Sequence, residues 1–170
     1  MGNALKQSSV KELLIAKDFG KEVLVKGWVR FFRSNRFIIL NDGSTINNIQ
    51  AVIDLNKVSA DETKEISVGA CLSISGKLME SNGSGQAVEI HVSSFEILGG
   101  ADPEKYPLQP KKHSLEFLRE IGHLRPRTNT FSAILRLRHA MTFAIHKFYN
   151  DRGFFSVHTP IITGSDCEGA

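Results

Sequence analysis

Five short runs of alternating apolar residues, separated by turns, constrain the fold of the first hundred residues more than any other feature. In the run 22–32, Val23, Val25 and Val29 fall on one side of an extended chain, and the rest is rich in aromatic residues. Gly27 interrupts this run, as glycine does where a barrel strand bends or bulges. The other runs cover residues 36–40, 48–55, 70–79 and 87–97. The pattern therefore predicts five strands that share one core.

The order of the elements narrows the choice of fold. Residues 59–66 begin with Ser59, a favourable N-cap, and carry acidic residues in the first turn, so they predict a short helix between the third and fourth strands. Three strands, a helix and two strands form the order of the OB-fold, an all-β, five-stranded Greek-key barrel that often binds oligonucleotides. We therefore expect an OB-fold domain at 21–99, preceded at 1–20 by a polar tail and a short amphipathic helix over 10–17.

The composition changes sharply after the barrel. Residues 99–110 hold three of the five prolines, which predicts a stiff linker, and we expect a hinge over 100–130 with a short helix at 114–121 and an irregular stretch at 124–130. Beyond it, apolar residues recur at spacings of three and four, which predicts a long amphipathic helix over 131–150; they are Ile134, Leu137, Met141, Ile145 and Phe148. Gly153 should cap this helix, and a strand should follow at 154–157. One helix and one strand cannot enclose a core, so 131–170 predicts the start of an unfinished domain.

Several classes of protein are excluded by simple features of the chain. The apolar runs are far shorter than the roughly 20 residues that span a bilayer, and residues 1–9 lack the apolar core of a secretion signal, so we expect a polar tail there. Cys71 and Cys167 belong to no paired motif and the six histidines are scattered, so we expect no metal site and a cytoplasmic protein. The net charge is only +3, but Lys21, Lys26 and three arginines lie between residues 21 and 36 against one acid, an excess that would attract phosphates.

The segment 152–162 (RGFFSVHTPII) resembles the first signature motif of the class II aminoacyl-tRNA synthetases, with Gly153, Phe154 and Pro160 at motif positions. In that family the motif is a long helix joined to a strand that opens the α/β catalytic domain and forms the dimer interface. The order barrel, linker, motif is typical of the aspartyl, asparaginyl and lysyl group. Residues 106–129 and 164–170 then resemble the asparaginyl enzymes in particular, so the likeness covers about 23–170.

This resemblance implies an activity for the full-length protein. It would be a homodimeric ligase that activates asparagine with ATP and Mg²⁺ and transfers it to tRNA(Asn), with no membrane partner. Catalysis in this class depends on positioning and on charge stabilisation around the phosphates. The arginines that provide it lie in the second and third signature motifs, and neither motif is in this chain. We therefore expect no catalytic residue, metal or cofactor in this segment, and no activity from it alone.

The resemblance also assigns anticodon-binding residues. In the related aspartyl enzymes an aromatic residue on the second strand stacks on the middle anticodon base, a uracil, and a glutamine on the third strand hydrogen-bonds to it. Phe37 and Gln50 occupy these positions, and Arg30, Arg33 and Arg36 are expected to contact phosphates. The alternatives are that Phe37 is barrel core, that Gln50 is a solvated strand residue, and that the arginines are surface residues. For Trp28, half-burial in the barrel is favoured over base stacking.

Two further residues are assigned to amino-acid recognition, and three rival functions stay open. Glu168 matches a glutamate that binds the substrate ammonium group in the aspartyl enzymes, and Ser165 lies in the same loop. The pocket that distinguishes asparagine from aspartate lies outside the chain, so one rival interpretation is that the chain belongs to an aspartyl-tRNA synthetase relative. A free-standing OB-fold module that binds nucleic acid is another, and a dimerisation fragment is the third. The apolar stripe of the long helix argues against the free-standing module.

Overall fold

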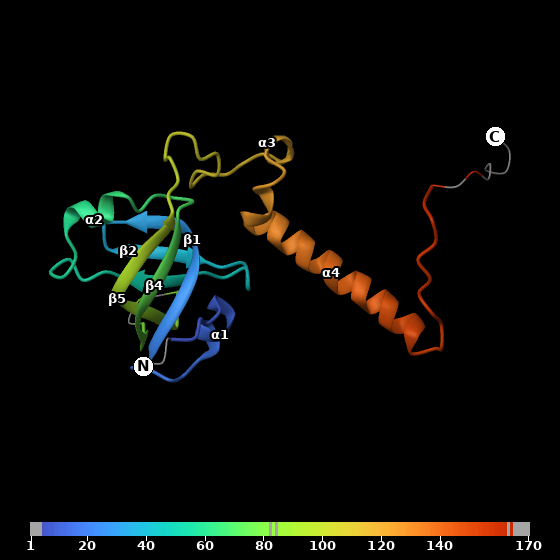
Figure 1. The fold of residues 1–170 in the computed structure, drawn as a ribbon, viewed down its shortest axis with the longest axis horizontal. Helices are drawn as coiled ribbons and strands as arrows, with labels where there is room; N and C mark the ends of the chain where they lie inside the picture. The colour runs from blue at the N-terminus through green and yellow to red at the C-terminus, as the bar shows by residue number, and fades with distance from the viewer. Residues whose placement is uncertain (1–4, 82, 84, 163, 165–170) are drawn as a thin grey trace.

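A closed five-stranded barrel forms the first part of the molecule in the computed structural model, which describes residues 5–81, 83, 85–162 and 164 (Figure 1). The strands are β1 (Glu22–Arg33), β2 (Phe37–Asn41), β3 (Ile49–Val52), β4 (Cys71–Glu80) and β5 (Val88–Gly99). They follow one another around the barrel in the order β1-β2-β3-β5-β4, and β4 closes it on β1. All pairs are antiparallel except β3 and β5, which are parallel. The predicted OB-fold is confirmed.

β1 is long enough to pair with two neighbours. Its first half, 22–28, pairs with β4, and from Trp28 onward it pairs with β2. Gly27 lies at this change of partner, where an added Cβ would stand 2.7 Å from the carbonyl oxygen of Asn41. The glycine is therefore needed for close approach of two backbones. The bulge itself is elsewhere in the strand, between Val29 and Phe31.

The barrel core is built from the inward residues of every strand. On β1 they are Val23, Val25 and Val29, as the alternation predicted, and on β2 they are Ile38 and Leu40. Helix α1 (Val10–Ile15) closes one end by burying Val10 and Leu13 in the same cluster. Helices α1 and α2 each begin with a capping box, which satisfies two orphan N–H groups at each start. Ser9 and Glu12 form the box of α1, and Ser59 and Glu62 that of α2 (Ala60–Lys64).

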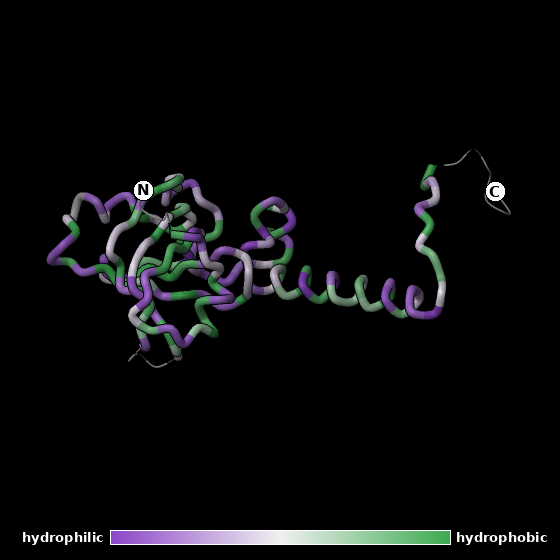
Figure 2. The backbone as a smooth tube through the Cα atoms, turned by 60° about the horizontal axis from the view of Figure 1, so that its bottom comes forward, coloured by the Kyte–Doolittle hydropathy of each residue, from purple (hydrophilic) through white to green (hydrophobic). Residues whose placement is uncertain are grey.

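After the barrel the chain crosses a linker and enters helix α3 (Leu115–Glu120), a 3₁₀ turn η1 (Arg125–Arg127) and the long helix α4 (Asn129–Asn150). Two different views place α4 pointing away from the barrel (Figures 1 and 2). Gly153 follows it with a φ of +84°, as expected of a glycine that ends a helix. Among the described residues, no helix is both long and apolar enough to cross a bilayer.

Three sequence predictions need correction in this structure. The third strand is shorter than 48–55, because the chain leaves the sheet after Val52. The stretch 124–130 is not irregular, since Pro126 fits the first turn of η1 and Thr128 caps α4. No strand forms at 154–157, because no strand among the described residues lies beside it to accept hydrogen bonds. The remaining expected elements are present to within a few residues.

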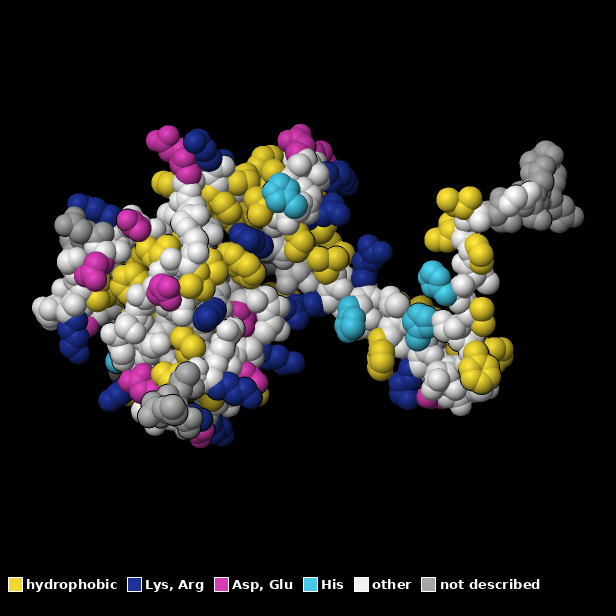
Figure 3. Space-filling model, viewed as in Figure 1, with side chains coloured by type: hydrophobic (Ala, Val, Ile, Leu, Met, Phe, Trp, Pro, Cys, Tyr) yellow, Lys and Arg dark blue, Asp and Glu magenta, His cyan; other side chains and the backbone are white. Residues whose placement is uncertain are grey.

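Helix α4 exposes its apolar stripe. Leu137 is 63% exposed and Met141 56%, and none of the α4 residues is buried. Figure 3 shows hydrophobic side chains gathered along the far half of α4 and the extended segment after it. Exposed apolar surface of this extent is typical of a protein interface rather than of an isolated helix.

Candidate nucleic-acid interface

Phe37 and Gln50 lie on the outside of the barrel, on neighbouring strands. Because side chains alternate along a strand, the burial of Ile38 and Leu40 turns Phe37 outward, where it is half-buried. Phe37 pairs with Val52, and Gln50 pairs with Ile39, the next outward residue of β2. Phe37 and Gln50 are thus diagonal neighbours on one face. The alternative in which Phe37 belongs to the core is wrong, and Gln50 is half-buried rather than fully solvated.

The strand register extends this face across four strands. One row runs through Arg33, Phe37, Val52 and His91, and the next through Phe31, Ile39, Gln50 and Glu89. We call these eight residues the outer wall. It combines two half-buried aromatic rings, an amide, a carboxylate and an imidazole, which are groups that stack on bases or bond to their edges. Beside it lies a hollow of about 440 Å³, lined by Phe37, Glu89 and His91 among others.

Two arginines flank the aromatic rings at the end of the β1–β2 hairpin. Its turn places Ser34 and Asn35 at φ values of 52° and 50°, and Arg36 N–H donates to the carbonyl of Arg33 at 3.0 Å. The guanidinium of Arg33 stands 5.3 Å from the centre of the Phe31 ring, and that of Arg36 stands 5.5 Å from the Phe37 ring. The turn therefore brings two exposed cations to the two rings, where they can reach phosphates next to a stacked base.

The Gln50 side chain is held by a network around Glu89. Gln50 Nε2 donates to Glu89 Oε2 at 3.1 Å, and Ser81 Oγ donates to the same oxygen at 2.9 Å. His91 Nε2 lies 3.0 Å from the other carboxylate oxygen. Burial raises the pKa of Glu89, but the hydrogen bonds from His91, Ser81 and Gln50 together outweigh it and leave the pKa below its ordinary value. Glu89 therefore stays ionised at neutral pH and fixes the orientation of the Gln50 amide.

Phe31, Glu89 and His91 were not found from the sequence. The bulge after Val29 shifts the alternation of β1 by one residue, so the pattern of the strand does not reveal that Phe31 faces outward. Glu89 and His91 are brought to Gln50 by the parallel pairing of β3 with β5, which are far apart in the chain. Alternation in the run 87–97 does indicate that these two residues share the face opposite to Val88 and Ile90, but not which strand they meet.

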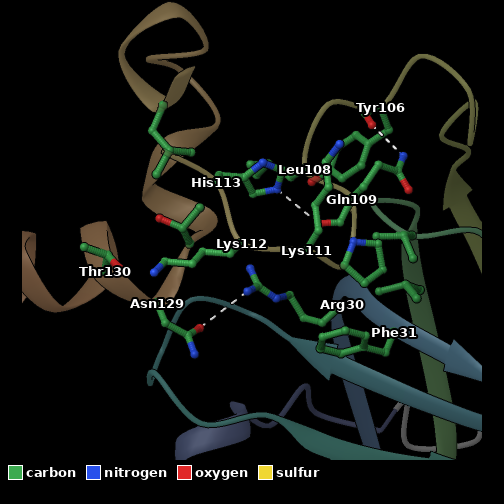
Figure 4. A pocket seen from close by; sticks show the side chains of 15 residues that line it. Arg30, Phe31, Tyr106, Leu108, Gln109, Lys111, Lys112, His113, Asn129 and Thr130 are labelled. Carbon is green, nitrogen blue, oxygen red and sulfur yellow. Dashed lines mark hydrogen bonds between the residues drawn. The ribbon is translucent and has the colours of Figure 1, made fainter. Parts of the chain in front are cut away.

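Arg30 does not join Arg33 and Arg36. The bulge turns it toward the linker, where its Nη2 donates to Asn129 Oδ1 of α4 at 3.4 Å (Figure 4). It lines a cavity of about 420 Å³ with Tyr106, Lys111 and Lys112. Burial lowers the pKa of Arg30, Tyr106 counteracts this, and the positive charge of Arg127 lowers it further. The three arginines that the sequence grouped together thus belong to two separate places.

The remaining predicted site residues fall in or near the C-terminal segment. Ser165 and Glu168 lie outside the described residues. Phe154 is 61% exposed and meets Tyr149 edge-on, with ring centres 5.5 Å apart. Pro160 is exposed in the extended chain that follows. No group of three or more metal-ligating side chains occurs in the part of the chain that the structure describes.

Two family models match the chain in turn. Residues 23–98 match the OB-fold nucleic acid binding domain, and residues 114–170 match the class II tRNA synthetases of the D, K and N group. The barrel, the linker and α4 thus define a chain of the class II aminoacyl-tRNA synthetases. Within that class the chain belongs to the asparagine–tRNA ligase family, because its curated relatives of that name are 51–57% identical over nearly all of it.

Individual relatives give the extent of the match. An asparagine–tRNA ligase of Cytophaga hutchinsonii is 57% identical over 98% of this chain and 37% of its own length, and that of Parabacteroides distasonis is 57% identical over 98% and 36%. The chain therefore spans little more than a third of these relatives.

Solved structures share the fold at lower identity. The asparaginyl-tRNA synthetase of Pyrococcus horikoshii complexed with asparaginyl-adenylate aligns with a TM-score of 0.83 at 22% identity, over 98% of this chain and 39% of that one. The aspartyl-tRNA synthetase of Entamoeba histolytica aligns with a TM-score of 0.73 at 22% identity, over 92% and 39%.

Proposed function

We propose that the full-length protein activates asparagine with ATP and transfers it to tRNA(Asn), and that the barrel of this chain reads the anticodon. The family supports the first part, and the outer wall supports the second. Mg²⁺ would accompany ATP in the full-length enzyme. The described residues offer it no ligand cluster, so no catalytic step is assigned to them. A cytoplasmic location, where tRNA is charged, belongs to the same proposal.

The observation that carries the anticodon proposal is the fixed amide of Gln50 beside the Phe37 ring. Stacking on Phe37 contributes about 1–3 kcal/mol for any base, so it cannot select one. Selection needs an edge with a defined order of donor and acceptor. Gln50 Nε2 is bonded to Glu89, and no other hydrogen bond among the described residues uses its amide, so Oε1 can accept from a base and the second N–H can donate to it.

Uracil fits that order and cytosine does not. Uracil presents the O4 acceptor next to the N3–H donor, which match the amide N–H and Oε1 of Gln50. Cytosine presents a donor at N4 instead, so it would require the amide to flip. A flipped amide would point Oε1 at the ionised Glu89 carboxylate, and the two oxygens would repel each other.

The test is binding of this chain to tRNA(Asn) and to the same tRNA with cytosine as the middle anticodon base, at one fixed salt concentration. We expect the base change to weaken binding by about tenfold or more, corresponding to about 1–3 kcal/mol for a well-made edge contact. Gln50→Ala should remove most of that difference, while Arg33→Gln should weaken binding to both RNAs alike. Equal binding of the two RNAs to the wild-type chain, with a steep loss at higher salt, would leave the barrel as a phosphate binder only.

We further propose that the apolar face of α4, continued by Phe154 and Pro160, pairs with a second copy of the chain. The support is the exposure of the stripe, including Leu137 and Met141, together with the resemblance of residues 152–162 to the motif that forms the dimer interface in this class. That segment lies within the part of the chain that the class II synthetase model matches. Glu168 and Ser165 remain the proposed contacts to the amino acid, and their test is the binding of asparagine by the full-length enzyme with Glu168→Gln.

A further inference from the structure

The linker touches the barrel through an aromatic side chain and an arginine. Tyr106 lies flat against Gly69, so that a Cβ added to Gly69 would stand 2.6 Å from the ring. Gly69 is itself joined to β1, because its N–H donates to the carbonyl of Val29 at 2.8 Å, and its φ of +92° is one that favours glycine. Any side chain at residue 69 would therefore collide with the Tyr106 ring. We call this backbone surface at Gly69, just before β4, the seat of Tyr106.

Arg127 connects this seat to the outer surface of β1. Its guanidinium stands 4.4 Å from the centre of the Trp28 ring, and its Nη1 donates to Tyr106 Oη at 3.4 Å. No carboxylate among the described residues pairs with Arg127, and its partners are a ring face and a phenol oxygen. A cation held against the face of an aromatic ring is attracted by the negative charge of that face. The contact joins η1, which leads directly into α4, to the barrel.

The linker between these contacts is stiffened by its own hydrogen bonds. Gln109 Nε2 donates to the carbonyls of Pro103 at 2.9 Å and Tyr106 at 2.7 Å, and Leu108 is only 8% exposed. Ser67 Oγ donates to the carbonyl of Ala101 at 2.5 Å. Farther along, Arg30 bonds to Asn129 at the start of α4, and Arg136 of α4 donates to the carbonyl of Gly43 in the β2–β3 loop.

We propose that Trp28, Tyr106 and Arg127, seated on Gly69, form a clasp that fixes the direction in which α4 leaves the barrel. They are positioning residues, because none of them lies on the outer wall. A rigid connection of this kind would let a tRNA bound at the barrel meet the rest of the enzyme in one geometry, a consequence that rests on the proposed function. The clasp itself does not depend on the proposed function, and the experiment that tests the clasp uses no RNA.

Arg125 supplies a matched control for the clasp. It lies in the same 3₁₀ turn as Arg127, but its guanidinium stacks at 4.7 Å over Phe131 of α4 and not on the barrel. Arg127→Gln therefore removes a contact between the linker and the barrel, whereas Arg125→Gln removes one between η1 and α4. Both residues lie outside the barrel core, so the barrel should fold in either variant. Tyr106→Phe removes the phenol oxygen and keeps the ring on Gly69.

Two readouts test the clasp in the complete 170-residue chain. Trp28 is the only tryptophan, so its fluorescence reports on the cation above it. Arg127→Gln should shift the emission and increase quenching by acrylamide, while Arg125→Gln should change neither. For the direction of α4, spin labels at Lys57→Cys and Arg138→Cys, in a chain with its two cysteines replaced by serine and diluted with unlabelled chain, give a distance distribution by pulsed electron paramagnetic resonance.

We expect Arg127→Gln to broaden that distribution, Tyr106→Phe to broaden it less, and Arg125→Gln to leave it as in the parent chain. An unchanged distribution in Arg127→Gln would overturn the clasp. So would equal broadening by both arginine variants, since that result would place the effect in η1 rather than in its contact with the barrel.

Discussion

At the scale of single residues, the outer wall exists because each barrel strand turns alternate side chains inward to the core and outward to the surface. Val52 lies between Phe37 and His91, and Ile39 lies between Phe31 and Gln50, so both add apolar surface to the wall. Gln50 owes its fixed orientation to Glu89, a residue 39 positions away in the chain. A polar side chain that is already bonded to protein recognises a ligand without first losing rotamer freedom, which favours selectivity.

Replacement of Glu89 by glutamine should weaken base selection more than it weakens binding. The amide introduced at this position would be both donor and acceptor, so the Gln50 amide could bond to it in either orientation. We expect the preference for uracil over cytosine at the middle anticodon position to fall by about tenfold, with a much smaller change in affinity for the uracil form. Glu96→Gln, an exposed change on the same strand, serves as the control. If Glu89→Gln kept the same preference for uracil over cytosine, the orientation of the Gln50 amide would not be the source of that preference.

The ionisation of Glu89 also predicts a dependence of stability on pH. Its pKa is lowered in the folded chain from an ordinary value of 4.5, so its bonds stabilise the fold above that value and are lost as the pH falls through the folded pKa. The difference in free energy of unfolding between the wild-type chain and Glu89→Gln should therefore shrink on acidification below pH 4.5. Urea titrations at a series of pH values measure it. A difference that stays constant through this range would contradict the assignment.

At the scale of elements, the short helix α1 depends on its cap and closes the end of the barrel. Ser9 Oγ accepts from Glu12 N–H at 3.2 Å, and Val10 N–H donates to Asp42 of the β2–β3 loop at 2.9 Å. The loop thus holds the first turn of the helix over the core. An isolated helix of six residues would not persist in water, so its stability comes from these contacts.

Ser9→Ala should lower the free energy of unfolding by about 1 kcal/mol, the ordinary contribution of an N-cap side chain. Denaturation in urea measures the change, and Ser8→Ala is the matched control. Ser8 binds β1 through its main chain, since its N–H donates to the carbonyl of Leu24 at 2.8 Å, and that bond survives the substitution. Equal losses in the two variants would show that the serine hydroxyl of the cap is unimportant.

How far the sequence predicts these elements depends on whether the signal is local. The alternation of Val23, Val25 and Val29 and the cap at Ser59 act over a few residues, and the corresponding elements were predicted. The bulge at Arg30 and the pairing of β3 with β5 depend on residues distant in sequence, so the separation of Arg30 from Arg33 was missed. Phe154 to Val157 has the composition of a strand, yet a strand also needs a neighbour to bond with.

At the scale of the whole molecule, the exposed face of α4 predicts that copies of the chain associate. We expect Leu137→Glu, which places a charge in the centre of the stripe, to shift the chain from dimer to monomer in sedimentation experiments. His139→Glu, on the exposed face of α4 opposite to the stripe, is a control for charge alone. The anticodon preference of the barrel should be the same in both variants. A wild-type chain that remains a monomer at micromolar concentrations would contradict the proposed pairing of α4.

The two sides of the barrel wall also separate stability from the proposed recognition of bases. The inward residues Ile38 and Leu40 carry the packing. Phe37 alternates with them along β2 and Gln50 pairs with the outward Ile39, so both contribute little to the core. Substitutions on the outside can thus accumulate without melting the domain. A barrel of this kind is an adaptable scaffold, on which a new base preference can be evolved or engineered while the interior stays unchanged.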